Sequence, residues 1–373
     1  MIFTYVAFLL LFFGTYNVHG LIKPQHDKVV VCYVASWAAY RPGNGAFSLE
    51  NLHSGHCTHL IYAFAGINAS NWTIKSLDPW ADMEKNGIGN YRKMTALRKQ
   101  GLKVSLGIGG WNEGSINYST MASSSDHRKT FIASTVEFLR TYEFDGLDLD
   151  WEFPGNRGGA LHDKQNFVNL VKELRNTFRE HRFLLTAAIS ANKDIIDKGY
   201  NISEISKYLD YIHVMAYDYH GAWNKQVLPN TPLRSKDQLS VICEALILYP
   251  QEWTTGWDNY SSTAYAIKKD HVVVYDDRKA IMIKVEYVKK QKLAGVMVWS
   301  IDTDDFQGKC SLLNDDMALL DGHDYPLMKS INAVLANNTI PSEEKNELNS
   351  SSMQLSSSIV FALSITMIIF SFT

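Results

Sequence analysis

Residues 145–154 read Asp-Gly-Leu-Asp-Leu-Asp-Trp-Glu-Phe-Pro. On a β-strand the side chains alternate between two faces, with a rise of ~3.3 Å per residue. Three acidic side chains would then share one face: Asp148, Asp150 and Glu152. Three apolar side chains would share the other: Leu147, Leu149 and Trp151. The pattern predicts a buried strand with a row of carboxyl groups on its inner face.

Neighbouring acidic residues on this face are about 6.6 Å apart, so they cannot all ionise cheaply in a site shielded from water. We expect at least one to hold a proton near neutral pH. Glu152 is the outermost, and a protonated carboxyl group at a strand end suits a general acid. A solvated acidic edge and a divalent-metal site are the alternatives. The apolar opposite face disfavours the first, and Phe153-Pro154 does not supply the glycine of a calcium loop.

The chain around this segment alternates short apolar runs with longer amphipathic stretches. The apolar runs are 28–36, 59–67, 103–110, 146–152, 184–190, 211–218 and 295–301. Apolar residues at helical spacing predict helices over 127–142 and 163–181. Apolar strands alternating with helices favour a parallel sheet covered by helices. The expected fold class is α/β, as a TIM (β/α)8-type barrel.

Polar and aromatic residues stand at the ends of most of these runs. They are Ser36, Trp37, Phe64, Gly109 to Trp111, Asp150 to Glu152, Tyr217, Asp218 and Trp299. In a barrel the active site lies at the carboxyl ends of many strands, whereas a doubly wound sheet gathers its ligand groups at one switch point. The spread over many strands therefore favours the barrel.

Residues 145–152 resemble the full DxxDxDxE signature of the glycoside hydrolase family 18 chitinases, most closely those of arthropod type. Other segments resemble strands of the same family: 32–37 the first, 62–64 the second, 103–112 the third, 215–221 the sixth and 295–302 the eighth. The resemblance extends from about Lys28 to Cys310 and implies one barrel domain over 21–336. The glycines of the third strand do not reproduce a dinucleotide-binding GxGxxG loop.

The resemblance implies catalytic roles for five residues: Glu152, Asp150, Asp148, Asp145 and Tyr217. Glu152 would protonate the glycosidic oxygen, and the substrate's own 2-acetamido carbonyl would attack the anomeric carbon, which gives net retention. Asp150 would stabilise the acetamido group as it becomes positive, supported by Asp148 and Asp145. Tyr217 would hold the acetamido oxygen.

The resemblance also implies residues that bind the sugar chain: Tyr33, Trp37, Phe64, Gly110, Trp111, Met215, Asp218, Trp223 and Trp299. Trp299 would form the floor under the reactive sugar. Core packing is the commoner role of an aromatic residue. Placement at strand ends favours binding for Trp111 and Trp299, while both roles stay open for Trp37 and Phe64. The expected ligand is chitin or chitooligosaccharides, with no cofactor and no metal.

The sequence departs from the family between the sixth and eighth strands. Only 76 residues lie between Asp218 and Gly295, where the family commonly has a seventh strand and an inserted α+β domain. We find no seventh strand and expect a truncated insertion at about 225–276. Either Val272 to Tyr275 closes the barrel, or the barrel is incomplete. An incomplete barrel would mean a protein that is weakly active, unstable or a product of aberrant splicing. The truncated wall of the cleft favours a chitin-binding, lectin-like protein over an endo-chitinase, whereas the presence of Glu152 favours the enzyme.

Composition excludes other classes of protein. The 373 residues include 36 Lys and Arg against 39 Asp and Glu, a formal net charge of −3, with 12% aromatic residues. The chain lacks the basic excess that nucleic-acid binding requires, so we expect no nucleic-acid partner. Its length allows a large core, and we expect a monomer.

The first 20 and the last 24 residues contain no Asp, Glu, Lys or Arg. Residues 1–20 resemble a signal peptide, with Val18 and Gly20 at the −3 and −1 positions of the cleavage site. Residues 337–358 form a serine-rich linker, and the hydrophobic tail 359–373 is a candidate glycosylphosphatidylinositol signal. A short tail anchor or a disordered tail are the alternatives. We expect a secreted protein or one anchored to the cell surface.

Cysteines and sequons fit the secretory pathway. Four cysteines allow three pairings, of which the simplest joins Cys32 to Cys57 and Cys243 to Cys310. The N-x-Ser/Thr sequons predict glycosylation at Asn68, Asn71, Asn117, Asn201, Asn259 and Asn337, with a seventh at Asn349.

Overall fold

The computed structural model describes residues 24–218, 251–259, 261–269, 271–309 and 324–337, and the backbone of 359–364 and 368–371. Several predictions from the sequence concern residues outside these ranges. They are the signal peptide 1–20, Trp223, the Cys243–Cys310 pair, Asn349 and most of the linker 337–358.

The core of the protein is a parallel barrel, as predicted. Seven strands between Val29 and Trp299 form most of it: β1 Val29–Ala35, β2 His59–Asn68, β4 Lys103–Gly109, β5 Gly146–Asp150, β6 Leu184–Ser190, β7 Tyr211–Met215 and β11 Gly295–Trp299. β1 pairs in parallel with both β2 and β11, so the sheet curls back on itself. The strand β3 (Thr73–Ser76) extends β2 as an antiparallel hairpin.

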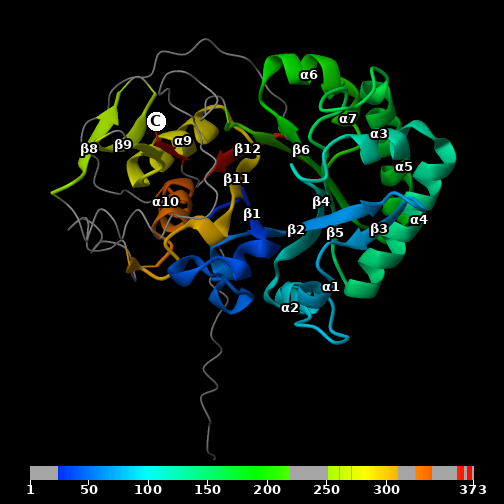
Figure 1. Ribbon diagram of the computed structural model, residues 1–373, viewed down its shortest axis with the longest axis horizontal. Coiled ribbons are helices and arrows are strands. Elements are labelled where there is room, and N and C mark those ends of the chain that lie inside the picture. Colours follow the sequence, from blue (N-terminus) through cyan, green and yellow to red (C-terminus); the bar gives the residue numbers. More distant parts are fainter. Residues whose placement is uncertain are drawn as a thin grey trace, which may run out of the picture.

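Helices cover the barrel from outside. The two helices predicted from spacing are confirmed as α4 (Ser125–Tyr142) and α5 (Asp163–His181). With α3 (Ile116–Ser123), α6 (Lys193–Gly199) and α7 (Ile202–Ile205) they lie on one side of the barrel (Figure 1). Two short helices, α1 (Pro79–Asp82) and α2 (Asn90–Ala96), precede β4.

The predicted two faces of β5 are confirmed. The side chains of Leu147, Leu149 and Trp151 are fully buried on the helix side. The Trp151 indole donates a hydrogen bond to Ser115 Oγ at 2.6 Å, and its ring stacks on Tyr118 with centroids 5.2 Å apart. This packing fixes the strand against α3, so the acidic face is turned toward the barrel interior.

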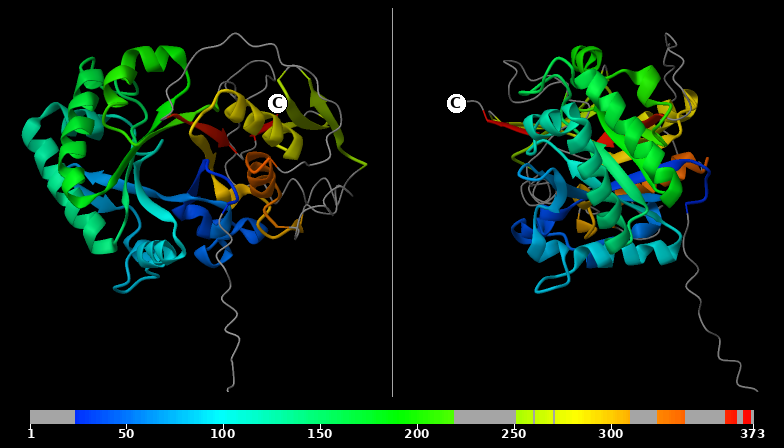
Figure 2. Two further views of the ribbon diagram at one scale, coloured as in Figure 1. Left: turned by 180° about the vertical axis from the view of Figure 1, so that it is seen from behind. Right: turned by 90° about the vertical axis from the view of Figure 1, so that its right-hand side faces the viewer.

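A small antiparallel sheet lies within the stretch 225–276, where we predicted a shortened insertion. Its strands are β8 Thr254–Asp258, β9 Thr263–Lys268 and β10 His271–Tyr275, and β13 (Ile368–Ser371) adds to β10. The helix α9 (Arg278–Lys290) leads from it back to β11. The two views of Figure 2 place this sheet and α9 on the side of the barrel opposite α4 and α5.

The prediction that Val272 to Tyr275 closes the barrel is wrong. Both edges of β10 already pair, one with β9 and one with β13, so no edge is free for the barrel. The gap between β7 and β11 is instead filled by β12 (Ile359–Ser364), which pairs in parallel with both strands. The ring of strands is therefore continuous, and its last member comes from the hydrophobic tail (Figure 1).

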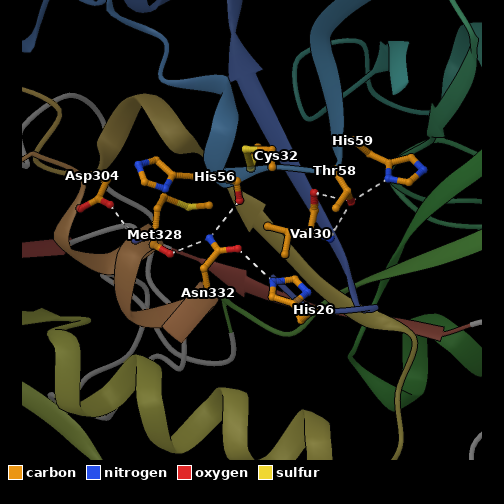
Figure 3. Close-up of a disulfide and its surroundings, with 10 residues drawn as sticks. His26, Val30, Cys32, His56, Thr58, His59, Asp304, Met328 and Asn332 are labelled. Atoms are coloured by element: carbon orange, nitrogen blue, oxygen red, sulfur yellow. Dashed lines mark hydrogen bonds between the residues drawn. A yellow bond between two sulfur atoms is a disulfide. The ribbon is translucent and has the colours of Figure 1, made fainter. Parts of the chain in front are cut away.

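The predicted disulfide between Cys32 and Cys57 is confirmed and ties β1 to the segment before β2. The helix α10 (Pro326–Leu335) packs beside it (Figure 3). Asn332 donates its side-chain N–H to the His56 carbonyl at 3.0 Å, and its Oδ1 lies 3.0 Å from His26 Nε2. The Asp304 carboxylate accepts the backbone N–H of Met328 at 2.9 Å and so caps the same helix.

The described sequons differ in exposure. Asn71, Asn259 and Asn337 are exposed, whereas Asn68, Asn117 and Asn201 are half-buried. Glycosylation at each stays a prediction.

Candidate active site

The three carboxyl groups of the acidic face are buried together at the carboxyl end of β5. Asp148 is fully buried, and Asp150 and Glu152 are each 4% exposed. Asp148 accepts hydrogen bonds from the Tyr33 hydroxyl at 2.5 Å and from Thr186 Oγ1 at 2.6 Å. These two donors, from β1 and β6, fix the innermost carboxylate and leave the outer two nearer the strand end.

Two tyrosines lie close to these carboxyl groups, and the pKa of each is raised. Burial, and then the charge of Asp148 and Asp150, raises the pKa of Tyr33 well above its usual value. Burial, and then the charge of Asp150 and Glu152, does the same to the pKa of Tyr200. Both hydroxyls therefore stay protonated and act as hydrogen-bond donors across the physiological pH range.

The glycines that end β4 allow close packing against the acidic strand. The Gly110 N–H donates to the Asp150 carbonyl at 2.8 Å. A Cβ at Gly109 would lie 2.2 Å from that same carbonyl oxygen, and one at Gly110 would lie 2.5 Å from the Phe64 ring. Both glycines also have positive φ, of 112° and 79°. A larger residue at either position would push β4 and Phe64 away from Asp150.

Three aromatic rings from different strand ends form a surface that we call the aromatic platform: Trp37, Phe64 and Trp299. The Trp299 ring lies 5.6 Å from Phe64 and 6.0 Å from Trp37, centroid to centroid, and Trp37 lies 6.0 Å from Phe64. Trp37 is 41% exposed. Trp299 also contacts Tyr33 at 5.4 Å, and Tyr33 bonds Asp148, so contacts connect the platform to the carboxyl groups.

Trp111 is exposed and is held by a residue that the sequence analysis missed. The guanidinium carbon of Arg157 lies 3.5 Å from the centroid of the Trp111 ring. Arg157 Nη1 also donates to the carbonyl oxygens of Trp111 (2.9 Å) and Glu152 (3.0 Å). Arg157 therefore connects Trp111 to the backbone of Glu152. The available signal was a cationic side chain in the loop directly after the acidic strand.

Three of the residues predicted at the end of β7 are described, and one of them, Tyr217, lies near the carboxyl groups. Met215 is buried at the end of β7, and Tyr217 packs half-buried against the core. Tyr217 is among the groups that raise the pKa of Tyr33, so it lies close to that hydroxyl. Asp218 is half-buried, with a φ of 59°. Trp223 falls outside the described residues.

Asp145 lies at the opposite end of the strand from Glu152. Its carboxylate accepts the Val104 N–H at 2.9 Å and pairs with Arg98 at 3.1 Å. It lies five positions before Asp150, about 16 Å away at the usual rise per residue. Any support that Asp145 gives to Asp150 acts through the position of β5, and that role stays a prediction.

Two partners of Asp148 were also missed. Thr186 bonds the carboxylate, and His213 Nδ1 lies 3.1 Å from Asp148 Oδ1 and 3.0 Å from the Tyr33 hydroxyl. Each is a polar residue inside an otherwise apolar strand, β6 or β7. That irregularity was the available signal, because a buried polar group needs a partner.

Among the described residues, no group of three His, Cys, Asp or Glu side chains could hold a metal ion. Within the same ranges, no helix is both long and apolar enough to cross a membrane.

A comparison with family models decides the family. The model described as Glycosyl hydrolases family 18 matches residues 29–247 and 240–304, which include β1 to β11. The chain belongs to this family. The two matched segments of family 18 overlap at residues 240–247. This overlap lies inside the stretch where we predicted the shortened insertion.

A relative of this family 18 chain is described as a probable chitinase. It is 41% identical to Probable chitinase 2 of Drosophila melanogaster over 390 aligned positions, covering 83% of this chain and 81% of the relative. Since 83% of 373 residues is about 310, about 80 of the 390 positions have no residue in this chain. That difference supports the predicted internal deletion.

Solved structures share the fold. The Ostrinia furnacalis Group IV chitinase in complex with allosamidin is 32% identical, with a TM-score of 0.75, covering 84% of this chain and 100% of that one. Human YKL-39, described as a pseudo-chitinase with retained chitooligosaccharide binding properties, is 27% identical, with a TM-score of 0.69, covering 83% and 99%.

Proposed function

We propose that the protein is an endo-chitinase that hydrolyses β-1,4-linked N-acetylglucosamine polymers, with Glu152 as the acid. The observation that carries the proposal is the buried row of Asp148, Asp150 and Glu152 at the end of β5. The aromatic platform, which Tyr33 connects to this row, supports sugar binding because aromatic faces pack on the apolar faces of sugar rings.

In the proposed reaction, Glu152 gives its proton to the glycosidic oxygen as the bond from that oxygen to the anomeric carbon breaks. The substrate's acetamido carbonyl oxygen forms a bond to the same carbon and becomes positively charged. Water then attacks the anomeric carbon, gives a proton to the Glu152 carboxylate and displaces the acetamido oxygen. Two displacements at one carbon retain its configuration.

Asp150 and Tyr217 have supporting roles in this scheme. The Asp150 carboxylate stabilises the positive charge that forms on the acetamido group, and Tyr217 holds the acetamido oxygen in place. The fixed hydrogen bonds of Asp148 to Tyr33 and Thr186 support these roles, because they hold the neighbouring carboxylate in one orientation.

The shortened insertion favours a second candidate function, a lectin-like protein that binds chitin with little or no hydrolysis. A missing wall would reduce the contacts available to distort the sugar. Hydrolysis of a fluorogenic chitooligosaccharide by the wild type and by Glu152→Gln tests both functions. If the protein is an enzyme, the wild type hydrolyses this substrate and Glu152→Gln does not. Equal rates would overturn the enzymatic proposal, and binding without hydrolysis would establish the lectin-like one.

We further propose that the protein is secreted and is either released or held at the cell surface by a lipid. The charge-free segments 1–20 and 359–373 and the Cys32–Cys57 disulfide support this location. Release of the protein from cells by a phospholipase that cleaves glycosylphosphatidylinositol would identify the anchored form. Its presence in the medium without that treatment would identify the released form.

A further inference from the structure

A buried ion pair joins two loops beside the aromatic platform. Arg41 Nη1 lies 2.8 Å from Asp302 Oδ2 and also donates to the Asp302 carbonyl at 3.1 Å. The two side chains are 9% and 0% exposed. Arg41 ends the 3-10 helix Ser36–Tyr40 that follows β1, and Asp302 lies in the 3-10 helix Ile301–Thr303 that follows β11.

Trp37 lies in a loop whose two ends both contact the Asp302 carboxylate. Its Oδ1 accepts the N–H of Ala35 at 2.9 Å, where the loop begins, while its Oδ2 pairs with Arg41, where the loop ends. In the middle of the loop, the buried Ala38 accepts the N–H of Phe47 at 3.0 Å. The backbone of the turn is thus fixed at three points around Trp37.

The same carboxylate belongs to the segment that carries Trp299, which lies three residues before it. The Trp37 and Trp299 rings, with centroids 6.0 Å apart and planes 44° apart, are therefore attached to two segments that the ion pair joins. A buried ion pair is a weak source of net stability, because desolvation of both charges offsets their attraction. Its best supported use is to fix one arrangement over others.

We propose that Arg41 and Asp302 are positioning residues that hold Trp37 against Trp299 and thereby set the affinity for the outer sugar units of a chitin chain. The inference rests on the proposed function. Trp299 contacts Tyr33 and, through it, Asp148, whereas Trp37 contacts the platform rings Phe64 and Trp299. Trp37 therefore contacts sugar units farther from the reactive one, and proton transfer at Glu152 does not depend on the pair.

The test compares a long and a short substrate. In Arg41→Met, the KM for chitohexaose rises about tenfold, the size expected for one lost aromatic contact. The kcat for chitohexaose and the KM for a fluorogenic disaccharide, too short to reach Trp37, stay within about twofold of the wild type. Arg41→Lys keeps the charge and restores most of the affinity for the hexamer.

Two further variants keep the test decisive. The double variant Arg41→Met with Asp302→Asn removes both charges of this pair and retains an oxygen for the Ala35 N–H, so it is expected to fold even if Arg41→Met does not. Arg128→Met removes an arginine of the same exposure, 9%, which pairs with the more exposed Glu173 at 2.7 Å between α4 and α5, far from the platform. It lowers stability and leaves both KM values unchanged.

Three results would overturn the inference. One is an unchanged KM for the hexamer in folded Arg41 variants. Another is an equal rise for both substrates, and the third is a failure of every Arg41 and Asp302 variant to fold, which would make the pair a stability element. A wild type that neither binds nor cleaves either sugar would instead overturn the proposed function.

Discussion

The acidic strand and the seam between β7 and β11 are two parts of one barrel that are built in different ways. β5 lies between β4 and β6, its neighbours in the chain, and α5 follows it directly. At the seam, β12 lies between strands that are far from it in sequence and pairs in parallel with both. The acidic residues are therefore positioned by elements that are neighbours in the chain, whereas the closure of this barrel depends on a distant segment.

The first and largest test concerns the acidic side. Glu152→Gln should lower kcat at least about 10³-fold, because an amide has no acidic proton to give to the glycosidic oxygen. Affinity for chitohexaose and the melting temperature should stay near those of the wild type. Glu180→Gln, on the exposed face of α5, is the matched control and should leave kcat unchanged. Residual activity near wild type would show that the acid is another group.

The seam is tested by ending the chain after Ser358. Without this tail, β7 and β11 lose their shared partner β12 and β10 loses β13, and we expect a loss of about 4 kcal/mol of stability, or about 8 °C in Tm. Thermal denaturation measures it. Val360→Pro in the full chain should act in the same direction, because proline cannot donate to the ladder between Gly295 and His213.

The seam test also decides between two roles for the tail. A tail removed during lipid attachment cannot supply β12. Mass spectrometry of the C-terminal peptide of the mature protein shows which occurs. An unchanged Tm in the shortened chain, with no tail peptide in the mature protein, would contradict the pairing of β12 and favour the lipid anchor.

The disulfide strengthens the part of the barrel around β1, which pairs with β11 at the border of the seam. Replacing Cys32 and Cys57 together by Ala should cost about 3 kcal/mol, since the bond closes a loop with a sequence separation of 25. Chemical denaturation of the two proteins measures the difference. A cost below about 1 kcal/mol would mean that packing of α10 against this loop fixes it without the bond.

The smallest expected effect is a dependence of stability on pH, caused by two histidines near the start of β2. Burial lowers the pKa of His56 and of His59 to about 4. The folded state thus binds fewer protons than the unfolded state between pH 6.5 and 4, so stability is lost as the pH falls through this window. We expect a loss of about 2 kcal/mol per histidine between pH 7 and pH 5, measured by denaturation at the two pH values. His59→Gln should flatten the profile, and an unchanged slope would contradict the assignment.

Much of the site could be predicted because it follows from alternation along single strands. The inner face of β5, the glycines that end β4 and the aromatic residues at strand ends are all local patterns, and the structure places them together. Arg157, Thr186 and His213 were missed because their partners lie on other elements, and one sequence does not say which strands become neighbours.

The sequence by itself determined the seven core strands, the two long helices and the acidic face, because each depends on periodicity or on a recognisable motif. Only the tertiary structure decided what closes the barrel and what holds Trp37 against Trp299. The reason is physical: the hydrogen-bonding edge of a strand accepts any extended segment that reaches it, so sequence pattern does not identify the partner. His271 to Tyr275 and Ile359 to Ser364 are both suitable strands. Because β10 pairs with β9 and β13, the position between β7 and β11 is occupied by β12.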